Sequence, residues 1–255
     1  MYIIGTQDGQ PNNSTVSFVR PSDPLKPQDP NIETLELSGT MAQIHLVKLR
    51  ADAFVVSDTS GNVGYARQVQ QISYSDQNVM VSTVPVAGNV DQALTQIYLA
   101  AFRRAPETEG YNYWMGEQKT RGLIGTADTI FNIESVQNIY PVSMTSSQFV
   151  TEIYRNVFDR APDTEGLNYW TTQLNSKSRG QLVIDITTAA LGTEEGTPGK
   201  DFFENRLDWS LYAVSYQQTH TEIAPDRLIA LTNTVNDMAA TTLKLVGQGE
   251  AGVLM

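Results

Sequence analysis

Residues 95–114 read TQIYLAAFRRAPETEGYNYW, and residues 151–170 read TEIYRNVFDRAPDTEGLNYW. The second stretch begins 56 residues after the first, and 13 of the 20 aligned positions are identical. Chance does not produce such agreement, so the chain contains an internal duplication. The residues that define the motif are Tyr98, Phe102, Arg104, Pro106, Gly110 and Trp114 in the first copy, and Tyr154, Phe158, Arg160, Pro162, Asp163, Gly166 and Trp170 in the second.

Each copy starts with helical periodicity. Apolar residues recur at the i, i+3, i+4, i+7 spacing that places them on one helix face. They are Leu94, Ile97, Tyr98, Ala101 and Phe102 in the first copy, and Phe149, Val150, Ile153, Tyr154, Val157 and Phe158 in the second. Proline disfavours the α conformation of its predecessor, so we expect these helices to end at Arg104 and Arg160. Each arginine can then reach the terminal carbonyls of its helix.

A second helix is predicted in each copy, because proline suits the first position of a helix. It begins near Pro106 in one copy and near Pro162 in the other. Trp114 and Trp170 lie on these helices, and we expect both to pack back on the aromatic residues of the preceding helix. The duplication assigns them the same role, so replacing either by alanine is expected to cost roughly 3–5 kcal/mol.

The rest of the sequence predicts an α+β fold with an N-terminal β-rich region and a helical domain. Short apolar runs such as Phe54-Val-Val56, separated by turn residues, are typical of strands. The expected divisions are a β-rich region with a proline-rich start at 1–88, a helical domain at 89–247 and a flexible tail at 248–255. Within the helical domain we expect repeats at about 90–122 and 146–180, further helices near 126–138 and 182–191, and C-terminal helices at 201–218 and 225–247.

Composition argues against several classes of protein. The 255 residues carry a net charge of −11, which repels phosphate backbones and disfavours nucleic acid as a partner. There is no cysteine, so disulfides and thiolate chemistry are excluded. No apolar stretch approaches the roughly 18 residues of a membrane span, so we expect no membrane insertion. The first residues lack the basic and apolar regions of a cleaved secretory signal.

Candidate catalytic residues are few. The two histidines, His45 and His220, lie in no recognised catalytic motif, and no G-x-S-x-G sequence is present. Carboxylates pair at Glu107/Glu109 and Asp163/Glu165. Each pair lies at a predicted helix N-terminus, where acids favour the helix dipole, so capping explains them better than a glycosidase site does. We therefore expect no enzymatic activity and keep a hydrolase as a remote alternative.

Calcium is the one cofactor that the residues leave open. Asp58, Asn62 and Asp76 are oxygen donors in predicted turns, which suits a calcium ion. Turn formation alone also explains them. Glu194-Glu195-Gly196 is a weaker candidate of the same kind.

The repeated segment resembles a bacterial domain of unknown function. The resemblance rests on Tyr154-x3-Phe158-x-Arg160-x-Pro162-Asp163-x2-Gly166-Leu167-x-Tyr169-Trp170 and its first copy, and it extends over roughly residues 90–246. That domain recurs in type I-secreted proteins, beside RTX-like calcium-binding glycine-rich repeats, and in surface-layer-like proteins. The resemblance implies secretion and a surface or matrix role. The glycine-rich G-G-x-G-x-D repeat itself does not occur in this chain.

Together these features predict an extracellular or cell-surface structural protein without catalytic activity. It would be a surface-layer-like, filament or matrix subunit that associates with itself into an oligomer or polymer. Export would follow a type I-like route without a cleaved N-terminal signal. The alternative is an adhesin or virion fibre module that recognises a cell-surface glycan or another surface partner.

Overall fold

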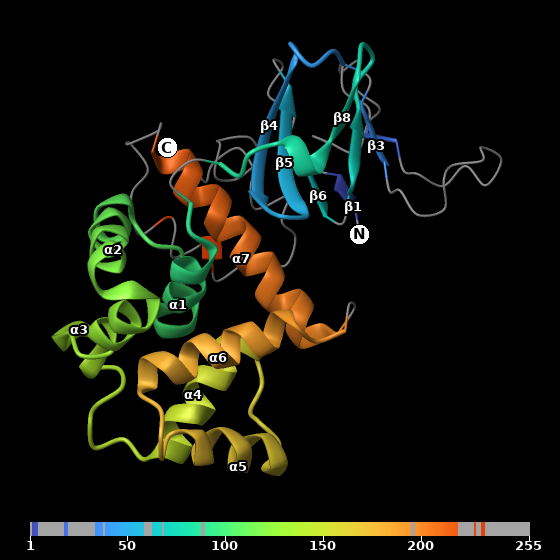
Figure 1. The fold of residues 1–255 in the computed structure, drawn as a ribbon. Helices are drawn as coiled ribbons and strands as arrows, with labels where there is room; N and C mark the ends of the chain where they lie inside the picture. The colour runs from blue at the N-terminus through green and yellow to red at the C-terminus, as the bar shows by residue number, and fades with distance from the viewer. Residues whose placement is uncertain are drawn as a thin grey trace. The chain divides into compact units, whose positions relative to one another are not determined.

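The computed structural model describes residues 2–4, 18–19, 34–37, 39–58, 63–67, 69–87, 90–194, 197–218, 227 and 231–232. Over these residues the predicted α+β class is confirmed (Figure 1). The described residues up to Val90 belong to a β unit, and those from Asp91 onward belong to a helical unit. Most of the predicted helix at 225–247 and all of the tail at 248–255 lie outside the described residues, although Arg227, Leu231 and Thr232 are helical.

The β unit consists of two sheets. Its strands are β1 (Tyr2–Ile4), β2 (Phe18–Val19), β3 (Thr34–Leu37), β4 (Ile44–Arg50), β5 (Ala53–Asp58), β6 (Val63–Arg67), β7 (Gln71–Ser73) and β8 (Asn78–Met80). One sheet has the order β1-β6-β5-β4 and is antiparallel throughout. The other has the order β2-β3-β7-β8, in which β3 and β7 run parallel. A 3-10 turn at Val81–Thr83 follows β8.

One hydrophobic cluster draws residues from both sheets. Phe54 of β5 lies opposite Ala66 of β6, and both join the cluster. Leu35 of β3 and Ile72 of β7 pair in parallel register and join it from the second sheet. Because side chains alternate along a strand, the run Phe54-Val-Val56 supplies the cluster at its first and third positions only.

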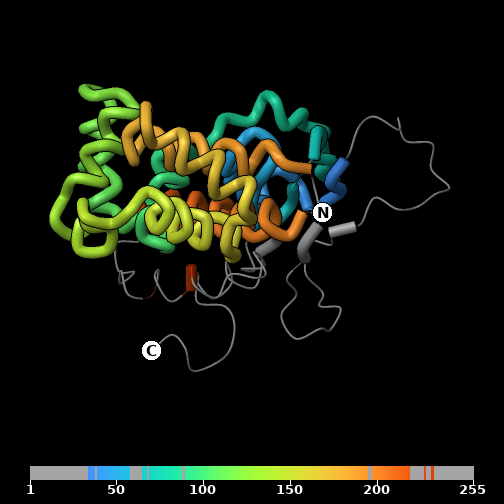
Figure 2. Tube along the Cα trace, turned by 90° about the horizontal axis from the view of Figure 1, so that it is seen from below, coloured from blue at the N-terminus to red at the C-terminus, as the bar shows by residue number. Residues whose placement is uncertain are grey.

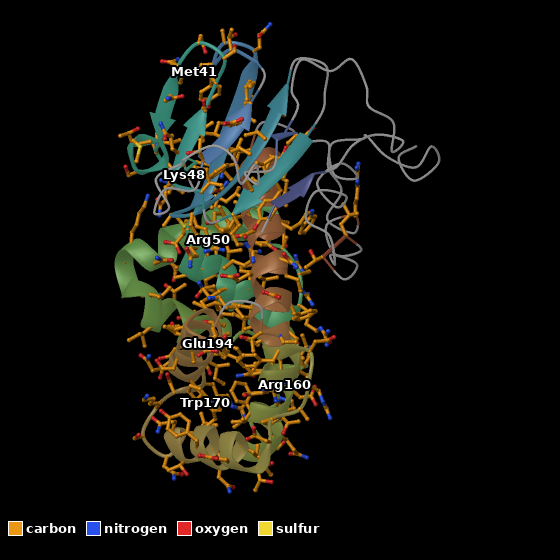
Figure 3. The ribbon with its side chains drawn as sticks, turned by 90° about the vertical axis from the view of Figure 1, so that its right-hand side faces the viewer. Met41, Lys48, Arg50, Arg160, Trp170 and Glu194 are labelled. Atoms are coloured by element: carbon orange, nitrogen blue, oxygen red, sulfur yellow. The ribbon has the colours of Figure 1, made fainter. Side chains whose placement is uncertain are left out.

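A buried lysine ties β4 to the turn after β8. Lys48 is 7% exposed, and its Nζ donates hydrogen bonds to the carbonyl oxygens of Val81 at 2.7 Å and Val84 at 3.0 Å. Nearby, Arg50 forms an ion pair with Asp52 at 2.5 Å; Figure 3 labels Lys48 and Arg50. A buried ammonium group needs such partners, because leaving it unpaired would cost several kcal/mol.

The helical unit contains the predicted duplication as helices. They are α1 (Gln92–Phe102), α2 (Thr108–Ile130), α3 (Glu134–Gln137), α4 (Ser146–Phe158), α5 (Thr164–Gln173), α6 (Arg179–Leu191) and α7 (Pro198–Gln217). Their course can be followed in Figure 2. Asp91 caps α1 by accepting a hydrogen bond from the Leu94 N–H at 2.8 Å. A capping box between Thr145 and Gln148 begins α4.

The helix ends differ from the sequence prediction. α1 and α4 end at Phe102 and Phe158, two residues before the expected arginines. The next residues, Arg103 and Asp159, adopt the left-handed conformation with φ of 57° and 53°. Gly122, where the first repeat is predicted to end, has non-helical φ and ψ of 69° and 171°, so α2 consists of two helical segments that meet in a kink at this residue. The offset of 56 places Gly122 opposite Ser178, the N-cap of α6, so α2 beyond its bend corresponds to α6.

Helix α7 is buried over most of its length. It packs on α1, α4 and α6, whereas α5 packs on α4 and has no buried residue. Trp209 in α7 has no exposed surface. This burial has a physical reason, because α7 carries apolar residues on several faces and such a helix is expected in the interior.

Gly180 permits close contact between α6 and α2. A Cβ atom built there would lie 2.5 Å from the Asp128 backbone nitrogen and 2.6 Å from the Ala127 carbonyl carbon. Real Cβ atoms do not approach backbone atoms so closely, so a side chain at this position would separate the two helices.

We predict that Gly180→Ala destabilises the helical unit by about 1–3 kcal/mol, because overpacking forces the backbones apart. Gly116, in α2, is the matched control, since a Cβ there would meet nothing within 4 Å. Gly116→Ala should be neutral or stabilising by up to about 1 kcal/mol, owing to the better helix propensity of alanine. Urea denaturation followed by circular dichroism checks both. Equal stability of the two variants would contradict the close contact.

Candidate functional site

In the first copy of the motif an arginine stacks on two aromatic rings. The ring centroids of Tyr98 and Phe102 are 5.0 Å apart, and the Arg104 guanidinium lies 5.9 Å and 5.6 Å from them. Arg104 also donates to the Ala105 carbonyl at 3.1 Å and forms an ion pair with Glu107. A cation over an aromatic face is attracted by the ring quadrupole, so the stack holds the turn between the helices.

The second copy repeats the stack. The rings of Tyr154 and Phe158 are 4.3 Å apart, and Arg160 lies 5.4 Å and 5.9 Å from their centroids. Arg160 donates to the Ala161 carbonyl at 3.4 Å. Both arginines therefore bond to the turn after the helix, and not to the final helical carbonyls as the sequence predicted. Those carbonyls pair instead with the backbone N–H groups of Arg103 and Asp159.

The acids after each proline stabilise the start of the second helix in different ways. Asp163 accepts a hydrogen bond from the Gly166 N–H at 2.7 Å, as an N-cap should. Glu107 occupies the same position but bonds to Arg104. Burial alone would raise the pKa of the Glu107 carboxyl, but the hydrogen bond from Arg104, a backbone hydrogen bond and the arginine charge outweigh it and lower that pKa. The motif glycine is explained as well, because a Cβ on Gly110 would lie 2.7 Å from the Tyr98 hydroxyl.

The two copies differ in what covers them. The Ala105 N–H donates to the Thr232 hydroxyl at 3.1 Å. Gln217, at the end of α7, bonds to the Pro106 carbonyl at 3.3 Å and to the Thr108 hydroxyl at 3.3 Å. In the second copy the equivalent residues are less covered: Ala161 and Thr164 are exposed, and Pro162 is half-buried.

The tryptophans show the same difference. Trp114 is only 5% exposed. Trp170 is half-buried. The equal packing that the duplication predicts for the two indoles is therefore wrong. Among the described residues, Gln217 and Thr232 bond to the turn of the first copy, and no equivalent bonds reach the turn of the second.

Equivalent positions of the two copies contact each other. The Asn156 side chain donates to the carbonyl of Ala100, the residue 56 positions earlier, at 2.7 Å. Arg103 and Asp159, also 56 apart, form an ion pair at 3.6 Å. Arg206 of α7 donates to the Arg103 carbonyl. Burial and the nearby Arg103 charge lower the pKa of the Arg206 guanidinium to about 10, against the opposing effect of Asp159.

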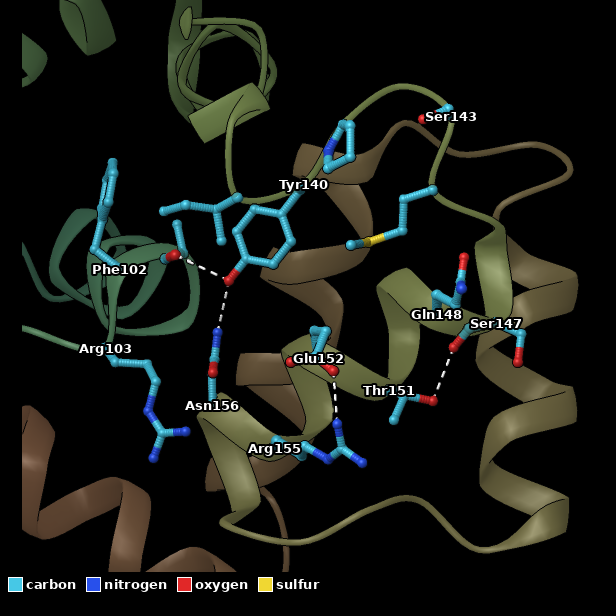
Figure 4. A pocket seen from close by; sticks show the side chains of 14 residues that line it. Phe102, Arg103, Tyr140, Ser143, Ser147, Gln148, Thr151, Glu152, Arg155 and Asn156 are labelled. Carbon is cyan, nitrogen blue, oxygen red and sulfur yellow. Dashed lines mark hydrogen bonds and ion pairs between the residues drawn. The ribbon is translucent and has the colours of Figure 1, made fainter. Parts of the chain in front are cut away.

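A groove of about 860 Å³ opens beside this contact (Figure 4). Tyr140 and Asn156 are buried at its base, where the Asn156 amide donates to the Tyr140 hydroxyl at 2.7 Å. Its other lining residues include polar side chains of α4 and apolar residues of the segment before it. Glu152 and Arg155 form an ion pair along it at 2.6 Å. The groove thus offers donors, acceptors and apolar surface to a polar ligand.

An arginine outside the groove holds one of its walls in place. Arg179 donates to the carbonyls of Tyr140 at 2.8 Å and Met144 at 3.0 Å. Its guanidinium lies 4.7 Å from the centroid of the Phe149 ring. The segment between α3 and α4 is therefore fixed from the first turn of α6.

The remaining candidates from the sequence do not converge on one site among the described residues. His45 is an exposed residue of β4, and His220 lies outside the described part of the chain. Asn62 and the side chain of Asp58 also lie outside it. The Asp76 carboxylate accepts a hydrogen bond from the Met41 N–H at 3.0 Å. Where side chains are described, no three histidine, aspartate or glutamate residues are grouped as metal ligands.

Sequence reasoning missed the residues that join the copies and cover one of them. Asn156 gave a signal, since it is a polar side chain next to apolar Val157 on a helix with a buried face. Gln217 and Thr232 gave none, because their partners lie more than 100 residues away. Tyr140 lies between predicted helices, where periodicity carries no information.

Comparison with protein families finds a match over residues 127–190 to a family described as a domain of unknown function, DUF4214. The matched segment contains the whole second copy of the motif and most of α6. Comparison with curated proteins finds no match, and neither does comparison with solved structures. Among the described helices, none is both long and apolar enough to cross a membrane.

We predict unequal effects of removing the two motif tryptophans. Trp114→Ala should cost about 3–5 kcal/mol, because it empties a buried site. Trp170→Ala should cost about 1–2 kcal/mol, because its indole already contacts solvent. Chemical denaturation of both variants at low protein concentration measures the difference. Equal losses would show that something covers the second copy in solution.

Proposed function

We propose that this protein is a non-enzymatic structural or assembly subunit of the cell surface or extracellular matrix. The observation that carries the proposal is the duplicated module with one covered and one open copy. The first copy lies under α7 and residues 231–232, whereas the second exposes the same turn and half of its tryptophan. A surface that is buried in one copy and open in its duplicate is suited to contacts with another molecule.

Further support comes from the likeness between this motif and domains of type I-secreted, RTX-like and surface-layer-like proteins. The match to a domain of unknown function is consistent with that likeness but names no location or activity. On this proposal the chain is exported by a type I-like route, and it associates with itself into an oligomer or polymer. Calcium would be an accessory of assembly, bound through oxygen donors. A hydrolase remains a remote third alternative.

The groove of Figure 4 favours a second candidate function, recognition of a surface glycan or another surface partner. Sugars are bound by hydrogen-bonding side chains set beside apolar or aromatic surface. In this groove the hydrogen-bonding side chains are those of Gln148, Thr151 and Arg155, and the apolar surface comes from Phe102 and Met144. Trp209 cannot take part in such binding, because its side chain is fully buried.

For the assembly function we predict that the average mass of the particles in solution rises with protein concentration. Sedimentation velocity of the purified full chain, with calcium or with a chelator, should show species larger than the 28.1 kDa monomer. Negative-stain microscopy of the same samples should show ordered particles or filaments. A strictly monomeric protein at high concentration in both conditions would contradict self-assembly. Recovery of the native protein only from the cytosol would contradict the surface location.

For glycan recognition we predict that Arg155→Ala reduces glycan-array binding at least fivefold. The reason is the loss of a charged donor at the groove, where a hydrogen bond to a charged group is worth about 1.5–3 kcal/mol. The matched control is Arg121→Ala, which removes an exposed arginine paired with Glu117 on α2, away from the groove. Equal binding by both variants, or no binding by the wild type, would rule out the groove as a glycan site.

A further inference from the structure

The first copy of the motif shows what its turn binds. Leu231 and Thr232 are helical and are 6% and 1% exposed. The Thr232 hydroxyl accepts a hydrogen bond from the Ala105 N–H. Ala105 lies just after the end of α1, so its N–H has no partner within that helix. The turn of the first copy therefore receives a hydroxyl residue of a helical segment, and that residue follows a buried leucine.

The second copy keeps the same turn without that cover. Its sequence Arg160-Ala-Pro-Asp-Thr differs from Arg104-Ala-Pro-Glu-Thr by one methylene group. Ala161 is exposed where Ala105 has no exposed surface. No described residue accepts a hydrogen bond from the Ala161 N–H. We call Phe158, Arg160, Ala161, Pro162 and Trp170 the open turn surface; Figure 3 labels Arg160 and Trp170 on it.

An apolar hollow adjoins the open turn surface. It measures about 470 Å³ and is shared by the end of α4 and the first turn of α7. Phe158 and Phe202 line it, together with Pro198 and the aliphatic stem of Lys200. The Lys200 ammonium is directed to the Thr193 carbonyl at 3.0 Å. The hollow can therefore take an aliphatic side chain beside the free Ala161 N–H.

We propose that the open turn surface docks an amphipathic α-helix of a different protein. The helix would place an aliphatic side chain in the hollow, and the following threonine or serine hydroxyl would accept from the Ala161 N–H. This mode repeats the hydrogen bond between the Thr232 hydroxyl and the Ala105 N–H of the first copy, and it follows the order of buried Leu231 and Thr232. The inference rests on the proposed assembly function, and it adds the chemical class of the partner and the surface that receives it.

A second copy of this chain is a poor source of that helix. Its Leu231–Thr232 segment already covers its own first copy. If the segment moved to the second copy of a neighbouring chain, it would cover the turn there but leave the first-copy turn of its own chain exposed. The exchange therefore gains no buried contact. A helix from another protein carries no such cost.

The test uses the full chain and a fluorescein-labelled, helix-stapled peptide of residues 226–240, which contains Leu231 and Thr232. Fluorescence anisotropy should show saturable binding at micromolar concentrations. Arg160→Ala should weaken it at least fivefold, because the stack that holds the turn is lost. Arg121→Ala, which removes an exposed arginine paired with Glu117 on α2, is the control and should leave the affinity unchanged. A peptide with Thr232→Val should bind about tenfold more weakly, since it keeps the shape and loses the acceptor.

Hydrogen exchange gives a second measurement that needs no variant. Peptide binding should protect the backbone amides of residues 159–167, including Ala161. Absence of binding, protection of residues 103–111 instead, or equal loss in Arg121→Ala and Arg160→Ala would overturn the inference. Loss of self-association in Arg160→Ala, measured by sedimentation velocity, would also overturn it, by showing that the occupant is a second copy. If the chain polymerises but does not bind the peptide, this inference is wrong and the proposed assembly function still stands.

Discussion

The stack of an arginine on a tyrosine and a phenylalanine organises the helical unit. Arg104 and Arg160 each cross from the turn back to the helix that has just ended, and each bonds to the carbonyl of the following alanine. The stack therefore fixes the angle at which the next helix leaves. The Tyr98 hydroxyl fills the space above Gly110, so the glycine lets that helix lie against the stack. The two residues before the stacked arginines, Arg103 and Asp159, adopt the left-handed conformation. They form an ion pair with each other, which joins the two copies.

One motif takes two environments in this chain, and the difference starts in the first helix of each copy. α1 carries Leu99-Ala-Ala101 where α4 carries Arg155-Asn-Val157. A helix that is apolar all round belongs in the interior, whereas one with a polar face belongs at a boundary. α1 is accordingly buried along Leu94–Ala101. α4 keeps Arg155 at the surface and uses Asn156 to reach the carbonyl of Ala100.

Much of this fold could be predicted from the sequence, because duplication and periodicity are local signals. The helices on both sides of each Ala-Pro turn and the buried character of α7 follow from them. The helix ends were misplaced by two residues, since Arg103 and Asp159 lack the glycine that usually marks a left-handed cap. The groove and the cover of the first copy could not be predicted. The groove joins residues such as Phe102, Tyr140 and Arg155. The cover joins the backbone of Ala105 to the side chain of Thr232. Only the tertiary structure brings these residues together.

The charge of the chain limits how it can assemble. A net charge of −11 opposes the approach of identical subunits, although salt screens exposed charges beyond about 8 Å at physiological ionic strength. Several cations of the helical unit are occupied within it: Arg104, Arg160, Arg179 and Arg206 lie over aromatic rings or bond to backbone carbonyls. They stabilise the fold more than they attract acidic neighbours. Contacts in the proposed assembly would therefore rely on apolar surface and backbone hydrogen bonds, and the open turn surface offers both of these to a helix of another protein.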